Sequence, residues 1–352
     1  MEFLTNHNLT RRAFLRKNIT ACVGLGFLST RGWKLDYLPF GMATIQNRFA
    51  RVLKNEVYSF VKPDKGADKA SEFSFDDVIP YQSILTIPAF QNHQVLWLRL
   101  EDGTYLCAED VQLTGNSLNE PHMQISNRGQ LAEITVPLTI AYSQKKNHQN
   151  RVEDQHFYYG STHWVYGLGK DREGNYYYRV LEDRWGDEYY IDATHAHVFS
   201  DDELTFPPAD EDGEKYLRID LKRQWITAEE NGNIVMGSPM SSGYHDAEIN
   251  LATPTGTFNI VYKRPSRHMV HTEEIGINDL ELYGVPWASY FVDGGIAIHG
   301  TYWHNRYGEK LSHGCINVPI PVAKWIYFWT QPAVPPREQK YVSQTGTRVE
   351  VF

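Results

Sequence analysis

Short runs of alternating apolar and polar residues, each closed by turn-forming residues, recur along most of the chain and limit the folds open to it. Residues 95–100 and 104–107 are two such runs, and the Asp-Gly turn between them predicts a β-hairpin. Strand-like runs dominate again after residue 214. The best helix candidate is residues 322–329, which follow two prolines. The sequence therefore predicts a mostly β fold with a short helix near the C-terminus.

One hairpin pattern occurs twice. The strand-turn-strand run of residues 97–108, with the acidic stretch that follows it, is paralleled by residues 176–193. Residues 114–133 are polar and predict a linker, and the acidic, proline-containing residues 203–213 predict a connector. Two β units of this size resemble bacterial SH3-like barrels. The expected folded domains are an SH3-like module at residues 50–115, a second at residues 136–203, and a last domain at residues 214–352.

Cysteine is scarce, and its position points to chemistry. The whole chain contains Cys22, Cys107 and Cys315. Cys315 lies in the run Ser-His-Gly-Cys-Ile-Asn, and His299 precedes it in the same segment. A thiol becomes a strong nucleophile at neutral pH when a neighbouring group stabilises the thiolate or removes the proton. The alternative interpretation is a buried cysteine that packs as a small apolar residue.

The order of the elements predicts how the two side chains meet. Residues 296–299 form a strand-like run that ends at His299, residues 300–311 form a polar and aromatic loop, and residues 311–316 bring the chain back. Two adjacent strand ends would set His299 beside Cys315. We therefore interpret Cys315 as the nucleophile and His299 as the general base that later returns the proton.

Four ordered segments resemble the L,D-transpeptidase (YkuD-type) family. The specific match is Ile-His-Gly-Thr at residues 298–301 with Ser-His-Gly-Cys-Ile-Asn at residues 312–317. Residues 253–258 resemble the family's TP-x-G-x-F segment, residues 241–243 its small-residue turn and residues 216–224 its opening strand. The resemblance covers about residues 214–352 and implies a β-sandwich catalytic domain with a short helix.

The resemblance also implies a reaction. The thiolate would attack the third residue of a peptidoglycan stem peptide, release D-alanine and form a thioester, and an amine of a neighbouring stem would then give a 3→3 cross-link. Attack by water would make the same site an L,D-carboxypeptidase, and a protein amine would give wall-protein anchoring. The Gly300 carbonyl would orient His299, and the N–H groups of Gly314 and Cys315 would stabilise the oxyanion. No cofactor is implied.

Six further residues are expected to contact the substrate. Asn317 stands where many relatives carry an arginine, so it offers neutral hydrogen bonds, and Arg306 in the loop is the candidate replacement cation. The full set is Tyr302, Trp303, Arg306, Ser312, His313 and Asn317.

The same residues are compatible with two other classes of function. A zinc hydrolase would have to draw its metal ligands from His268, His271, His299, His304, His313 and Cys315. These residues contain no H-E-x-x-H motif, and the histidines lack the i, i+4 spacing of ligands on one helix face. We therefore predict no metal site. A wall-binding protein with a decayed site is disfavoured by the intact His299 and Cys315.

The N-terminal segment predicts where the protein acts. Residues 1–43 contain a twin arginine, Phe-Leu and then a weakly apolar stretch, an order typical of a twin-arginine export signal. The stretch at residues 19–28 is too short for an ordinary membrane span. We expect a periplasmic, cell-wall or extracellular monomer, with no stable membrane span beyond an uncleaved signal. Removal of the signal on export would leave two cysteines, Cys107 and Cys315. Cys107 is expected to be buried, and no disulfide is predicted. The net charge of −9 disfavours nucleic-acid binding.

Overall fold

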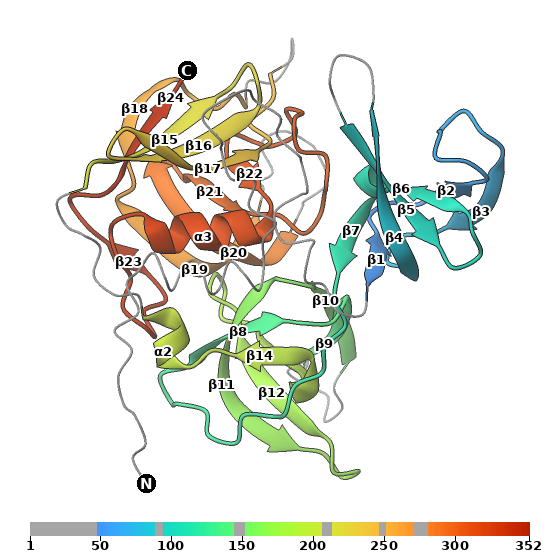
Figure 1. The fold of residues 1–352 in the computed structure, drawn as a ribbon. Helices are drawn as coiled ribbons and strands as arrows, with labels where there is room; N and C mark the ends of the chain where they lie inside the picture. Colours follow the sequence, from blue (N-terminus) through green and yellow to red (C-terminus); the bar gives the residue numbers. More distant parts are fainter. Residues whose placement is uncertain (1–47, 89–93, 144–151, 206–212, 246–250, 271–280) are drawn as a thin grey trace, which may run out of the picture.

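The structure, a computed structural model, describes residues 48–88, 94–143, 152–205, 213–245, 251–270 and 281–352. Its strands form four sheets, and its helical segments are short (Figure 1). The mostly β fold predicted from the sequence is therefore confirmed. In these ranges no helix has the length and apolar character needed to cross a membrane. The expected signal at residues 1–43 lies outside the described residues.

The first seven strands form one sheet in the order β3-β2-β6-β5-β4-β1-β7. The predicted hairpin is β5 and β6, with Leu98 paired to Leu106 in the buried core of this module. Gly103 in its turn has a φ of +85°, which a residue with a Cβ rarely adopts. The elements are β1 (Phe49–Val52), β2 (Val57–Phe60), β3 (Lys69–Phe73), β4 (Val78–Pro88), β5 (Gln94–Leu100), β6 (Tyr105–Cys107), the 3-10 helix η3 (Ala108–Asp110) and β7 (Val111–Thr114).

The next seven strands repeat this arrangement. Their order, β10-β9-β13-β12-β11-β8-β14, is the order of the first sheet with every number raised by seven, and a 3-10 helix again precedes the last strand. The repeat seen in the sequence is thus a repeat of topology. The elements are β8 (Gln130–Ile134), β9 (Leu138–Ser143), β10 (Val152–Tyr158), β11 (Thr162–Lys170), β12 (Tyr176–Leu181), β13 (Glu188–Asp192), η4 (Ala193–His195) and β14 (Ala196–Val198).

The second sheet begins earlier than residue 136. Strand β8 occupies the end of the expected linker at residues 114–133, where Leu131, Ala132 and Ile134 are buried. Polar Gln130 is also buried, because its side chain accepts a hydrogen bond from the backbone N–H of Ser126 at 3.0 Å. This internal partner lets a polar residue begin a buried strand, which the composition of the segment did not reveal.

The C-terminal strands form two five-stranded sheets. We call β17-β16-β15-β24-β18 the opening sheet and β22-β21-β20-β19-β23 the site sheet. The opening sheet contains β15 (Lys215–Asp220), β16 (Trp225–Glu230), β17 (Asn233–Pro239), β18 (Gly256–Asn259) and β24 (Arg348–Val351). The site sheet contains β19 (Tyr262–Val270), β20 (Glu281–Val292), β21 (Ile296–Gly300), β22 (Ile316–Val318) and β23 (Tyr341–Val342). Both contribute to one core, for example Leu217 and Ile219 from the opening sheet and Ile298 and Ile316 from the site sheet.

The predicted helix is α3 (Ile320–Trp329), which contacts β20 and β21 and lies across the site sheet (Figure 1). It begins two residues before residue 322, so Pro321 lies in its first turn, where no backbone N–H donor is needed. A second helix, α2 (Asp201–Leu204), overlaps the start of the expected connector. Ser200 and Glu203 form a capping box that stabilises this single turn.

The second module shares a core with the two C-terminal sheets. Leu131, Trp164, Phe199 and Leu204 belong to the same buried cluster as Trp287 of β20. The rings of Phe199 and Trp287 pack edge to face with their centroids 5.8 Å apart. The second module is therefore part of the structure that supports the site sheet.

Candidate active site

The register of the site sheet brings His299 and Cys315 to one face. β21 and β22 run parallel, with His299 opposite Asn317, so Cys315 precedes β22 at the level of Ala297. Cys315 packs against the small cluster that contains Ala297, whereas Ile298 points into the main core on the other face. Since side chains alternate along a strand, His299 and Cys315 are diagonal neighbours on the same face.

His299 is oriented by the backbone. It is 2% exposed, and its Nδ1 lies 3.0 Å from the carbonyl oxygen of Gly300. A carbonyl oxygen can only accept, so this contact places the proton on Nδ1 and leaves the lone pair of Nε2 as the basic site. Burial lowers the pKa of His299 to about 4, against the smaller raising effect of the Gly300 bond. The imidazole is therefore neutral at pH 7.

Gly300 is needed at this position for its size. A Cβ there would lie 2.9 Å from Cγ of Pro286 and 3.1 Å from Cα of Ile320, at the start of α3. A larger residue would push α3 away from the strand that carries His299. Glycine thus permits the close packing that fixes the carbonyl beside the imidazole.

The thiol of Cys315 is half-buried and free. Its Sγ lies 3.8 Å from the carbonyl oxygen of Gly295. Burial raises the pKa of Cys315, and a hydrogen bond from the backbone of Ala297 partly opposes this. Together with the lowered pKa of His299, this favours a neutral thiol beside a neutral imidazole over a preformed ion pair. Cys107 is also free but only 1% exposed, and burial raises its pKa to about 11.

The turn before Cys315 is held by hydrogen bonds. Gly314 has a φ of +113°, and its carbonyl oxygen accepts from Oγ1 of Thr253 at 2.8 Å. The same Thr253 Oγ1 accepts from the N–H of Gly243 at 2.9 Å. Gly243 leaves no room for a side chain, since a Cβ would meet the Leu251 carbonyl oxygen at 1.9 Å. Thr253, from a motif that suggested no individual role, is therefore the link between the small-residue turn and the cysteine turn.

Residues 214–351 match the family model of YkuD, the L,D-transpeptidase catalytic domain. The chain carries a YkuD domain. A curated relative, the "Putative L,D-transpeptidase YciB" of Bacillus subtilis (strain 168), is 30% identical over 122 residues, which are 32% of this chain and 59% of that protein. The match thus spans about three-fifths of the relative's length.

Solved structures of L,D-transpeptidases are also similar to this chain. The catalytic domain from E. faecium is 25% identical, with 40% of this chain and 97% of that chain covered and a TM-score of 0.31. The L,D-transpeptidase from Mycobacterium smegmatis is 20% identical, with 49% and 77% covered and a TM-score of 0.33.

Three of the expected substrate contacts, Trp303, Arg306 and His313, lie at different places in the YkuD domain. Trp303 packs beside His299, with ring centroids 5.7 Å apart, and the exposed His313 lies 5.8 Å from the ring of Tyr244. Arg306 is exposed but is ion-paired with Glu309, so it is not an unpaired cation. Trp303 therefore lies beside His299, His313 lies beside Tyr244 at the surface, and Arg306 lies at the outer edge of the loop.

Three of the expected substrate contacts, Ser312, Tyr302 and Asn317, make hydrogen bonds within the fold in this conformation. The Ser312 hydroxyl accepts from the N–H of Gly314 at 3.2 Å and donates to the carbonyl oxygen of Cys315. This contact also occupies the Gly314 N–H that was expected to face an oxyanion. Tyr302 is 3% exposed, and its hydroxyl donates to the Tyr283 carbonyl oxygen at 2.8 Å. These contacts within the fold leave Ser312 and Tyr302 little freedom to bind a substrate.

Asn317 is covered by the loop that precedes the cysteine. It is 3% exposed, and its Nδ2 lies 3.0 Å from Nε2 of His304. Its backbone forms a two-way bridge with Ser241, at 2.8 and 2.9 Å. Burial lowers the pKa of His304 to about 3, so that imidazole is neutral and can accept the amide proton. Asn317 therefore stabilises the loop in this conformation.

The described histidines of the candidate zinc set do not come together as metal ligands. Within the described ranges, no three His, Cys, Asp or Glu side chains are arranged as metal ligands. His304 turns toward Asn317 and His313 is exposed, while His271 lies outside the described residues.

Arg51 of the first module reaches the loop of the YkuD domain, a contact that sequence reasoning missed. Its Nη2 donates to the carbonyl oxygen of Tyr302 at 2.7 Å, and Asn305 Nδ2 donates to the carbonyl oxygen of Ala108 at 2.9 Å. A lone arginine within a strand-like run gives no signal of such a partner, because the partner lies far away in the sequence.

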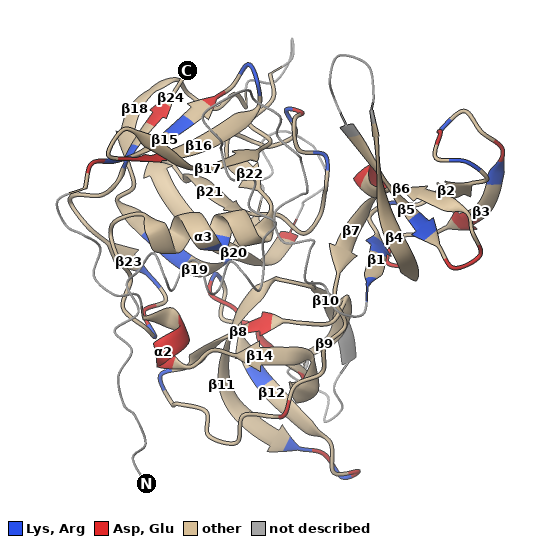
Figure 2. Cartoon of the chain, viewed as in Figure 1, with Lys and Arg blue, Asp and Glu red and all other residues tan. Residues whose placement is uncertain are grey.

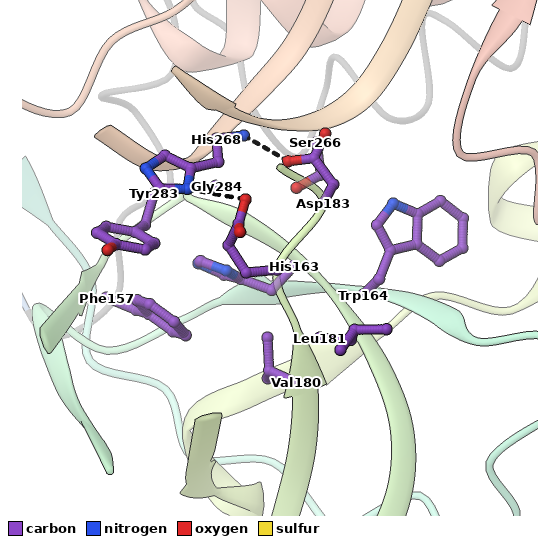
Figure 3. Close-up of a pocket in the computed structure, with 11 residues that line it drawn as sticks. Phe157, His163, Trp164, Val180, Leu181, Asp183, Ser266, His268, Tyr283 and Gly284 are labelled. Atoms are coloured by element: carbon purple, nitrogen blue, oxygen red, sulfur yellow. Dashed lines mark hydrogen bonds and ion pairs between the residues drawn. The ribbon is translucent and has the colours of Figure 1, made fainter. Parts of the chain in front are cut away.

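A small cavity of about 10 Å³, room for roughly one water molecule, lies between the second module and the YkuD domain (Figure 3). His163 and Glu182 line it from the second module, and His268 and Tyr283 line it from the site sheet. Neither His299 nor Cys315 borders it. We therefore regard it as an interface cavity.

Proposed function

We propose that this protein is an exported L,D-transpeptidase that joins peptidoglycan stem peptides by 3→3 cross-links through a thioester on Cys315. The observation that supports this most is the parallel pairing of β21 with β22, which sets His299 and Cys315 as diagonal neighbours on one face. The contact of His299 Nδ1 with the Gly300 carbonyl oxygen, which leaves Nε2 basic, supports the same assignment.

Acylation would begin from the neutral pair. As Cys315 Sγ attacks the carbonyl carbon of the third stem residue, Nε2 of His299 takes the thiol proton, and the carbonyl electrons move to oxygen. The backbone N–H groups of Gly314 and Cys315 are the proposed donors to that oxyanion, and Gly314 must first release Ser312 Oγ. When the peptide bond breaks, His299 returns the proton to the nitrogen of the leaving D-alanine, and the thioester remains.

Deacylation would reverse the roles. An amine from the side chain of a neighbouring stem attacks the thioester carbon, His299 accepts a proton from that amine, and the departing sulfur of Cys315 regains it. Water in place of the amine gives a tripeptide, the carboxypeptidase outcome, and an amine on a protein gives wall anchoring. Exclusion of water from the acyl-enzyme would decide between them.

The remaining parts of the chain are assigned to delivery. Residues 1–43 are proposed to direct export by the twin-arginine route, which places the protein in the periplasm, in the cell wall or outside the cell. The two repeated modules are proposed to be SH3-like barrels that accompany the catalytic domain. We propose that the enzyme works as a monomer on peptidoglycan stem peptides, without metal, cofactor or nucleic acid.

The test is incubation of the purified protein with a disaccharide-tetrapeptide, followed by separation of the cross-linked dimer from the tripeptide. We expect dimer with the unaltered protein, neither product with Cys315→Ala, and a large loss with His299→Ala. Cys107→Ser is the matched control and should retain turnover, because that thiol is buried and protonated. Substantial turnover by Cys315→Ala would refute the mechanism.

A second experiment separates thiol from metal chemistry. After incubation with a carbapenem, mass spectrometry should find a covalent adduct on Cys315, with or without a chelator present. Activity that is lost on chelation and restored by zinc, without an adduct, would instead support a zinc hydrolase.

A further inference from the structure

Gln224 joins the opening sheet to the small-residue turn that lies beside Cys315. It is the last residue of the turn between β15 and β16, is 4% exposed and has a φ of +52°. A residue other than glycine is uncommon in this left-handed region, so the surrounding structure has to hold it there. The proposed catalytic steps make no use of this buried side chain.

The side chain of Gln224 is paired with Ser242 in both directions. Gln224 Oε1 accepts from the backbone N–H of Ser242 at 2.8 Å, and Gln224 Nε2 donates to Ser242 Oγ at 2.8 Å. Nε2 also donates to the carbonyl oxygen of Leu221 at 2.7 Å, and the backbone carbonyl oxygen of Gln224 accepts from the Met240 N–H at 3.0 Å. Because a backbone N–H can only donate, the contact with Ser242 assigns the orientation of the amide.

A neutral amide suits this buried position. The opening sheet carries charged side chains on β15 and β24, which are coloured in Figure 2, and Arg218 lies there 3.0 Å from Glu350. The Arg218 side chain is 47% exposed, so that ion pair lies at the surface. A charge in place of Gln224 would have to be desolvated, whereas the amide supplies both the donor and the acceptor that face Ser242.

The small-residue turn holds the cysteine turn at both ends. The Ser242 carbonyl oxygen accepts from the N–H of Ser312 at 3.0 Å, which fixes the chain before Cys315. Ser241 and Asn317 exchange backbone hydrogen bonds at 2.9 and 2.8 Å, which fix the chain after it. Cys315 therefore lies between two points whose positions depend on the small-residue turn, and Gln224 anchors that turn to the opening sheet.

One more hydrogen bond leads from Ser312 to a proposed oxyanion donor. The Ser312 hydroxyl accepts from the Gly314 N–H at 3.2 Å and donates to the Cys315 carbonyl oxygen. The direction of the Gly314 N–H therefore depends on where Ser312 is held. Oxyanion donors act at about 2.7–3.1 Å from the oxygen, and a misplacement of about 1 Å can cost roughly 100-fold in rate.

We propose that Gln224 is a positioning residue for acyl transfer at Cys315. Acting through Ser242 and Ser312, it sets the direction in which the Gly314 N–H meets the oxyanion. The proposal rests on the proposed function and deepens it. It predicts that loss of the amide slows the reactions of the thiol that pass through an oxyanion and spares those that do not.

The test compares two reactions of Cys315 in the full chain, each followed by mass spectrometry. A carbapenem acylates the thiol through a tetrahedral oxyanion, whereas iodoacetamide alkylates it by displacement of iodide, without one. Gln224→Leu should slow acylation by about 10- to 100-fold and alkylation by less than about two-fold. D-alanine release from the tetrapeptide should lose kcat with KM nearly unchanged. Gln339→Leu is the matched control and should change none of these rates, because the Gln339 amide donates to the Tyr166 hydroxyl of the second module.

Gln224→Glu should show a rescue that depends on pH. A protonated glutamic acid keeps the shape of the amide together with one donor and one acceptor, whereas the carboxylate has no donor for Ser242 Oγ. Burial disfavours the carboxylate. Relative to the unaltered protein at each pH, acylation of this variant should therefore rise as the pH is lowered from about 8 to about 6.

Several outcomes would overturn the inference. Equal slowing of acylation and alkylation by Gln224→Leu would do so, because it would show a general loss of structure around the thiol, and so would unchanged acylation. If Gln224→Leu does not fold, the pH series of Gln224→Glu decides, and a constant ratio to the unaltered protein refutes the positioning role. An unaltered protein that neither reacts with the carbapenem nor releases D-alanine would refute the proposed function instead.

Discussion

Replacing Arg51 by methionine should both destabilise the protein and slow the transfer reaction. The guanidinium is 2% exposed and makes contacts to all three parts of the chain. Its Nη1 lies 2.6 Å from Asp76 Oδ1, and its Nη2 donates to the Tyr302 carbonyl oxygen at 2.7 Å. It also lies 3.8 Å from the ring centroid of Tyr158 in the second module.

The structure gives the size of the effect. Removing one partner of a buried ion pair costs about 3–5 kcal/mol, because the other charge is left unpaired. Asp76 keeps its contact with His156 at 2.9 Å, and its side chain is 11% exposed, so we expect about 3 kcal/mol. For a unit of this size that corresponds to a melting temperature lower by roughly 6–12 °C. The Tyr302 carbonyl oxygen also loses its donor, which frees the loop that places Trp303 beside His299.

The assay combines urea unfolding with the cross-linking reaction. Arg51→Met, Asp76→Asn and the double variant form a cycle, and we expect a coupling energy of at least about 1 kcal/mol. Arg48→Met is the control, since Arg48 is exposed and donates to the Gln82 carbonyl oxygen at 3.2 Å; it should cost less than about 0.5 kcal/mol. An Arg51→Met protein that matches the unaltered protein in both stability and turnover would refute the reasoning.

Three further outcomes are expected. His299 has a folded pKa near 4 against 6.5 for the free group, so its stabilising contribution is complete above pH 6.5 and is lost as the pH falls toward 4. Urea unfolding should show a loss of about 2 kcal/mol from this residue between pH 7 and pH 5, and His299→Gln should flatten the profile. Gly314→Ala places a Cβ at a φ of +113°, so it should cost about 1–3 kcal/mol and slow alkylation of Cys315 by iodoacetamide; an unchanged rate would contradict the role of that turn. Thr253→Val keeps the shape but removes the hydroxyl that joins two turns, so urea unfolding should show a loss of about 1–3 kcal/mol, and a neutral result would count against that link.

The sequence predicted those features that local patterns determine. The alternation of apolar and polar residues predicted the hairpin of β5 and β6. The similar run at residues 176–193 forms β12 and β13, which occupy the equivalent positions in the second sheet. The expected strand that ends near His299 is β21, and the parallel pairing with β22 brings Cys315 to the same face. Local pattern suffices there because strand ends and side-chain alternation are properties of neighbouring residues.

Features that depend on distant residues were missed. Tyr302 was expected to contact the substrate, but it is buried, and its carbonyl oxygen accepts from Arg51, far away in the sequence. Arg264 and Arg267 look like ordinary charges on a strand until Asp183 of another module is placed between them. Partner choice between modules is decided by tertiary packing, which leaves no periodic signal in either segment.

The core shared by Trp164, Phe199 and Trp287 has a consequence for how the molecule comes apart. Because the second module and the YkuD domain share this core, neither can unfold without exposing apolar side chains of the other. Calorimetry should therefore record a single unfolding transition for both. If a protease released the YkuD domain alone, the apolar surface around Trp287 would be exposed to solvent. The released domain would then tend to aggregate. The shared core thus makes the second module a fixed support for the YkuD domain.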